Sequence, residues 1–239
     1  MYNVRPGSQE EQVGRLILAG VLIVALPAIP FGNFFLYPFT ILTTWFHEMG
    51  HGLTALFLGY GFDHLVILPD GSGYAETRRP ADGSNIANAL IGAGGPLGPT
   101  MAGSLLILAS SRHDWWKAAL LALAAALVLS TLVWVRSLTG IVVLPLLAGA
   151  MGWIALKGSD WLQRFSLQFL GILGALSMFT DWGYLFTERT VLAGQVMYSD
   201  TGMIEQSLWL PHWIWAILII AISGLMIGAS LKYALARQG

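Results

Sequence analysis

Seven apolar runs, each long enough to cross a lipid bilayer, dominate this sequence. A helix needs about 20 apolar residues to span the hydrocarbon core. The runs lie near residues 13–31, 36–59, 86–110, 115–135, 138–156, 163–186 and 208–233. Because 56% of the chain is hydrophobic and only 10% is charged, a water-soluble domain is excluded. We therefore expect one domain over residues 1–239, an all-α polytopic transmembrane helical bundle of about six to seven spans in the cell membrane.

The segment between the second and third runs has a different pattern. Strand-forming residues at 62–68 precede a Pro-Asp-Gly turn at 69–71, and a more polar stretch follows at 74–78. This pattern predicts a small β-hairpin after the second span. If successive spans alternate in direction, the hairpin lies on the same side of the membrane as the N-terminus, together with the start of the third span.

The second apolar run contains the sequence His47-Glu48-Met49-Gly50-His51. On a helix, His47 and His51 are one turn apart on the same face, so both imidazoles can bind one metal ion while Glu48 acts as a base beside them. Alternatively, the histidines bond to neighbouring carbonyls and Glu48 pairs with an arginine. Ionisable side chains are costly in lipid and mark functional sites, so we favour a Zn²⁺ site.

A third zinc ligand must be a histidine, aspartate or glutamate, because the chain has no cysteine. Asp181 is our first choice, since it lies within an apolar run at a depth similar to that of the histidines. It can also be a carboxylate at a helix end, paired with an arginine. Asp200 is the alternative third ligand, and it can equally cap a helix or form a turn.

Two further segments are candidates for the walls of this site. The third span begins with small residues and prolines, which let a neighbouring helix approach closely and loosen the backbone. These residues either pack against the second span or line the metal cavity, the candidates for lining being Gly94, Gly95 and Pro96. The first strand of the hairpin could hold an extended substrate by strand addition, with candidate contacts at Leu65, Val66, Ile67 and Leu68.

The motif in a membrane helix, followed by a hairpin and a Gly-Pro-rich third span, resembles the M50 family of intramembrane zinc metalloproteases, the site-2 protease class. The M50B-like branch is the most similar, on residues 92–98, residues 135–140, Asp181 and the pair Ser199-Asp200. The resemblance implies zinc held by His47, His51 and an aspartate, with Glu48 activating water. The Leu-Asp-Gly element in which site-2 proteases usually carry that aspartate is absent, so Asp181 and Asp200 both remain candidates.

The expected function is therefore that of a zinc-dependent metalloendopeptidase, which hydrolyses a peptide bond of a membrane protein substrate in the lipid bilayer. A catalytically inactive membrane metal-binding protein of the same architecture is the main alternative. A transporter is a weaker one, because it predicts charges on several spans, and only Asp181 adds to the motif. Nucleic acid is excluded as a partner, since the net charge is −1 and no long basic run is present.

Overall fold

The computed structural model describes residues 9–78, 83–180, 182–192 and 194–236, apart from the side chains of residues 9 and 178–180. The elements in this part of the chain are α1 (Gln9–Ala25), η1 (Leu26–Ala28), α2 (Gly32–Phe57), β1 (Gly61–Ile67), β2 (Gly73–Arg78), α3 (Asn85–Ser110), α4 (His113–Val133), α5 (Leu138–Lys157), α6 (Asp160–Thr180), α7 (Trp182–Leu185), β3 (Arg189–Leu192), β4 (Gln195–Tyr198), α8 (Asp200–Leu208) and α9 (His212–Ala236). The predicted helical bundle with a hairpin after the second helix is confirmed.

Six helices in the described ranges are long and apolar enough to cross a membrane, so this is a multi-pass membrane protein. They are Glu10–Ala28, Asn85–Ser110, His113–Val133, Leu138–Lys157, Asp160–Leu185 and His212–Ala236. The predicted run at 36–59 forms helix α2 but is not among them. Its three ionisable motif residues and its threonines lower the hydropathy of that helix.

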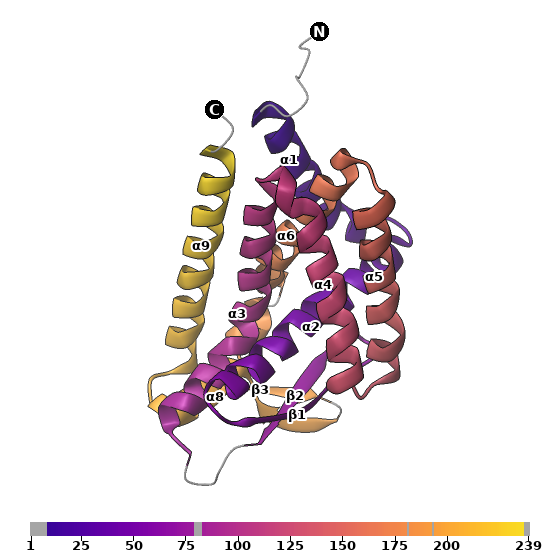
Figure 1. Ribbon diagram of the computed structural model, residues 1–239. Helices are drawn as coiled ribbons and strands as arrows, with labels where there is room; N and C mark the ends of the chain where they lie inside the picture. The colour runs from indigo at the N-terminus through magenta and orange to yellow at the C-terminus, as the bar shows by residue number, and fades with distance from the viewer. Residues whose placement is uncertain (1–8, 79–82, 181, 193, 237–239) are drawn as a thin grey trace.

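Figure 1 shows the start of α1 and the end of α9 at one end of the bundle and β1, β2 and α8 at the opposite end. The hairpin therefore lies with the start of α3, as expected, but on the side away from the N-terminus, contrary to the prediction. The reason is the path of α2, which runs obliquely across the bundle and does not return to the N-terminal end. Counting spans alternately assumes that each apolar run passes from one end of the bundle to the other and back, and α2 does not return to the end at which α1 begins.

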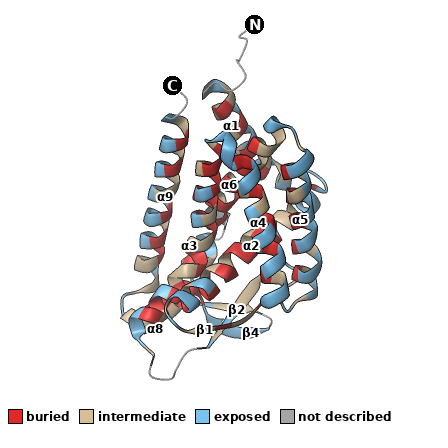
Figure 2. Cartoon of the chain, viewed as in Figure 1, coloured by how far each residue is buried: buried red, intermediate tan, exposed pale blue. Residues whose placement is uncertain are grey.

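The buried faces of the helices turn towards one another, and exposed residues lie mostly on the outside (Figure 2). Large apolar side chains are among the exposed ones, for example Leu132 at 72% and Leu225 at 74%. Water would make such an exterior unfavourable, whereas lipid does not. The surface is thus consistent with a bilayer around the bundle.

Helices α2 and α3 cross with their backbones in contact. A Cβ atom added to Gly50 would lie 2.1 Å from the carbonyl oxygen of Gly94, and one added to Gly98 would lie 2.4 Å from that of Phe46. Only glycine permits this approach, which small residues commonly provide between membrane helices. The crossing fixes the face of α2 that carries the histidines directly against α3.

Strand β1 is paired on both of its edges. It runs antiparallel to β2, and its other edge bonds to the α4–α5 connection, where the Leu65 amide donates to Trp134 (2.9 Å) and the Arg136 amide donates to Leu65 (2.9 Å). Leu65 and Ile67 are fully buried. The hairpin is therefore anchored by β1, and β2 is its outer strand.

Candidate metal centre

Helix α2 and helix α8 bring two histidines and one aspartate together. The Nε2 atom of His47 lies 2.9 Å from Asp200 Oδ2, and the Nε2 atom of His51 lies 3.1 Å from Asp200 Oδ1. The two Nε2 atoms are 3.2 Å apart. These three residues form a group of potential metal ligands whose ligand atoms all lie within 4.8 Å of one another.

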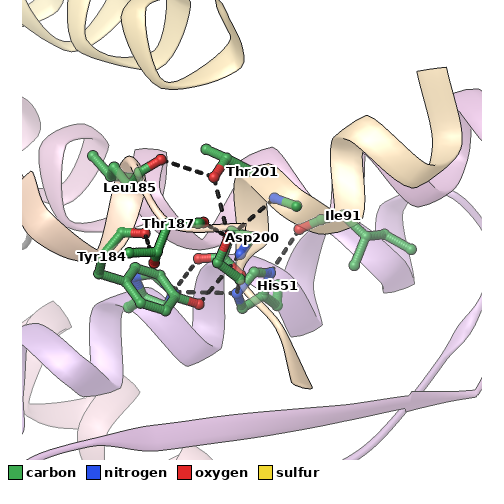
Figure 3. Close-up of polar contacts among 10 residues, drawn as sticks. His51, Ile91, Tyr184, Leu185, Thr187, Asp200 and Thr201 are labelled. Carbon is green, nitrogen blue, oxygen red and sulfur yellow. Dashed lines mark hydrogen bonds and ion pairs between the residues drawn. The ribbon is translucent and has the colours of Figure 1, made fainter. Parts of the chain in front are cut away.

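A backbone carbonyl orients His51. Its Nδ1 atom lies 2.7 Å from the carbonyl oxygen of Ile91 on α3 (Figure 3). A carbonyl oxygen only accepts, so Nδ1 carries the proton and the lone pair of Nε2 faces His47 and Asp200. Histidines that bind metals are held in this way, with the other ring nitrogen donating to a fixed acceptor.

The start of α8 fixes Asp200. Ser199 caps this helix by accepting a bond from the Gly202 amide (3.0 Å), and the hydroxyl of Thr201 donates to the Leu185 carbonyl (2.8 Å), as Figure 3 shows for Thr201 and Leu185. The Asp200 side chain is thus buried in a defined position. Burial opposes its ionisation, but the imidazoles of His51 and His47, when both ring nitrogens are protonated and no metal is bound, outweigh burial and hold the pKa of the carboxyl well below its ordinary value.

The donor set fits zinc. Asp200 Oδ2 is buried and has no hydrogen-bond partner, and it lies 2.9 Å from His47 Nε2, so these two potential ligand atoms are close enough to bind one ion. A tetrahedral zinc with bonds of about 2.0–2.2 Å holds its ligand atoms roughly 3.3 Å apart. The observed separations of 2.9, 3.1 and 3.2 Å approach that value.

A cavity of about 350 Å³ opens beside the three residues. Its walls come from α2, β2, α3, α7, the β3–β4 hairpin and α8, and they include Glu48, Gly73, Tyr74, Ala75, Thr77, Ile91, Tyr184, Leu192, Met197, Tyr198 and Met203. Glu48 is only 4% exposed, and the backbone of Ala75 interacts with its carboxylate. The glutamate therefore lies between the histidines and strand β2.

The outer edge of β2 faces this cavity. Leu65 directs its backbone groups away from β2, towards residues 134–136. Ala75 is opposite Leu65, and the two form a non-hydrogen-bonded pair. In such a pair each residue points its backbone N–H and C=O groups away from the other strand, so those of Ala75 point outward from the hairpin. Gly73 lies two residues before Ala75 and Thr77 lies two residues after it, so their backbone groups point the same way. All three line the cavity, so β2 presents its outer edge to the site, and on that edge the Ala75 amide is the group that interacts with Glu48.

A family model described as Peptidase M50B-like matches residues 16–230. The chain belongs to this family. The matched range contains the motif, the hairpin, the glycine-rich part of α3 and Asp200, which confirms the resemblance seen in the sequence. Comparisons with curated proteins and with solved structures gave no match.

The structure of this M50B-like protein brings three of the four predicted ligands together. His47, His51 and the alternative ligand Asp200 lie together, whereas Asp181 lies outside the described residues. Gly95 packs against the edge of the imidazoles that carries the Nε2 atoms, since a Cβ atom there would lie 2.1 Å from His51 Nε2 and 2.7 Å from His47 Nε2. Gly94, Gly95 and Pro96 are not among the described residues that line the cavity.

The predicted substrate contacts lie on an edge of β1 that is already paired. The edge of β1 formed by Leu65–Leu68 is already occupied by the α4–α5 connection and by Ser137, whose hydroxyl accepts from the Ile67 amide (3.0 Å). An added strand therefore has access to β2 and not to β1. The hairpin was visible in the sequence, but its pairing with residues 70 positions away was not.

Sequence reasoning missed the residues that close the cavity from the C-terminal half. Tyr184 lies with its hydroxyl 3.3 Å from the Asp200 amide (Figure 3). Leu192, Met197 and Met203 add apolar surface. These residues follow no spacing rule and come together only through tertiary structure, although the strand-like stretch at 189–198 could have suggested a second hairpin.

Proposed function

We propose that this M50B-like protein is a zinc-dependent intramembrane metallopeptidase that hydrolyses a peptide bond of a membrane protein substrate. One observation carries the proposal. His47, His51 and Asp200 converge on one point, and Glu48 and a free strand edge share the same cavity. A site that only stored metal would need neither the buried glutamate nor the strand edge.

The residues divide the chemistry among them. His47, His51 and Asp200 would hold the zinc, which when bound polarises a carbonyl group and lowers the pKa of a water molecule. Glu48 accepts the proton of the attacking water and returns it to the leaving amine. The Tyr184 hydroxyl lines the same cavity and can donate a hydrogen bond to the substrate carbonyl.

The substrate is held as an extended strand on the β2 edge. A helical peptide bond is shielded by the neighbouring turns, so a transmembrane substrate must unwind before it can be attacked. The outward backbone groups of Gly73 and Thr77, together with the carbonyl of Ala75, compensate for the lost helical hydrogen bonds by β-strand addition. Apolar side chains of the substrate meet Leu192, Met197 and Met203 on the opposite wall.

The proposed activity requires zinc. We expect the purified protein, reconstituted in lipid vesicles with single-span membrane substrates, to bind one zinc per chain and to cleave at least one substrate. Removing the metal with a chelator should abolish cleavage, and equimolar zinc should restore it. Zinc bound at one per chain without cleavage of any member of a broad substrate panel would instead indicate the inactive metal-binding protein.

Removing one outward amide of β2 should weaken substrate binding. Thr77→Pro deletes a backbone N–H that the strand edge offers, and a backbone hydrogen bond contributes about 0.5–1.5 kcal/mol. We expect KM to rise roughly 2–10-fold, with a smaller effect on kcat. Thr77→Ala is the matched control, because it removes the side chain and keeps the amide. Equal KM values for the two variants would contradict pairing at this position.

A further inference from the structure

Two arginines are buried at the end of the bundle that carries the termini. Arg15 on α1 is 5% exposed and Arg164 on α6 is 4% exposed. Both lie within candidate membrane spans, where a charged side chain is costly unless it is paired. Neither belongs to the proposed metal centre at the opposite end of the bundle (Figure 1).

The partners of these arginines do not balance their positive charge. Arg15 donates through Nε to Gln168 (3.0 Å) and pairs through Nη1 with Glu11. Arg164 lies over the ring of Trp116, with 5.4 Å between Cζ and the ring centroid. In the described part of the chain, Arg15 has Glu11 as its carboxylate partner, and no carboxylate forms an ion pair with Arg164.

Four buried nitrogen donors in this cluster have no hydrogen-bond partner. They are Arg15 Nη2, Arg164 Nε, Arg164 Nη2 and Gln168 Nε2. An unsatisfied buried donor costs about 1–3 kcal/mol, and more when the group is charged. A cluster of donors with excess positive charge is suited to an anion with several oxygen atoms.

The depth of the cluster corresponds to the headgroup region of a bilayer. Arg164 is four residues, or about 6 Å, from the start of α6. Gln12 on α1 donates to the carbonyl of Ala234 near the end of α9 (3.3 Å), so α9 joins the cluster at the same level. Glu11, with a side chain 25% exposed, marks where the cluster meets the surface.

We propose that Arg15, Arg164 and Gln168 bind the phosphate of an anionic phospholipid between α1 and α6. Guanidinium groups bind phosphate oxygens in a planar, bidentate geometry, and basic pockets between membrane helices bind acidic headgroups. The phosphate supplies acceptors to the unpartnered donors and cancels the excess charge. This inference is independent of the proposed peptidase activity.

The test is the thermal stability of the purified full-length protein in detergent, followed by tryptophan fluorescence. Phosphatidylglycerol in mixed micelles at about 100-fold above its Kd should raise the Tm by on the order of 5 °C. Phosphatidylcholine should raise it less, because its headgroup has no net charge. Inorganic phosphate should have little effect, and a rise equal to that from phosphatidylglycerol would overturn the assignment to a lipid.

Substitutions test whether the rise in Tm comes from lipid bound at the arginine cluster. Arg164→Gln should abolish the rise, whereas Arg112→Gln should keep it, because Arg112 is an exposed residue at the same end. Gln168→Glu covers the case in which Arg164→Gln does not fold. It supplies the missing negative charge inside the cluster, so it should be stable without lipid and insensitive to phosphatidylglycerol. A response of Gln168→Glu equal to that of the wild type, or loss of the response in Arg112→Gln, would overturn the proposal.

Discussion

Glu48→Gln should lower the rate of substrate cleavage by about 10²–10⁴-fold, the usual contribution of a general base. Glutamine has nearly the same shape but cannot accept a proton from water. Glu48 is not one of the three grouped ligand residues, so the zinc content should stay at one per chain. The measurement pairs a single-turnover cleavage assay with the metal content of the same preparation.

Glu76→Gln is the matched control for this variant. Glu76 lies on β2, the strand beside the site, but its side chain is 59% exposed and pairs with His64. Cleavage by Glu76→Gln should remain close to that of the wild type. If Glu48→Gln cleaved as fast as Glu76→Gln, Glu48 would not be the base, and the proposed division of roles at the site would have to be abandoned.

Asp200→Ala should remove the zinc. Asp200 presents one carboxylate oxygen to each histidine, at 2.9 and 3.1 Å, and alanine leaves the two imidazoles without a third ligand. Loss of a group that only hydrogen-bonds to a metal ligand costs about 10–100-fold in affinity, so loss of the ligand itself should cost at least that much. Metal analysis after dialysis against buffered zinc measures the change.

Two variants make this result specific. Asp181→Ala should retain zinc if Asp200 is the third ligand. Asp160→Ala removes an exposed carboxylate on the first turn of α6, and it should leave the zinc content unchanged. Zinc lost from Asp181→Ala and kept by Asp200→Ala would assign the third ligand to Asp181. The two aspartates were both candidates in the sequence, and this experiment separates them.

The two histidines and the glutamate were predictable because their geometry is local. A spacing of four residues on a helix brings two side chains to one face whatever the rest of the chain does. The proposed third ligand was not predictable in this way. Asp181 was preferred for its place in an apolar run, whereas Asp200 meets the histidines because the chain returns to the site through α8.

The hairpin was also predictable only in its local structure and not in its tertiary contacts. An apolar run, a Pro-Asp-Gly turn and a more polar return predicted its two strands, yet the strand that presents its edge to the cavity is β2. The Trp134 carbonyl and the Arg136 amide occupy the edge of β1, and no local pattern reports a bond between Leu65 and residues near 135.

By itself, the sequence determined that this is a polytopic membrane bundle with an imidazole pair and a glutamate on one helix face. Those features depend on hydropathy and helical periodicity, which act within a single segment. The tertiary structure decided that Asp200 meets the histidines and that β2 borders the cavity. It also brings Arg15 and Arg164 together far from the metal centre. These arrangements depend on helix crossings between distant segments, where the close approach of Gly50 and Gly94 sets which faces meet.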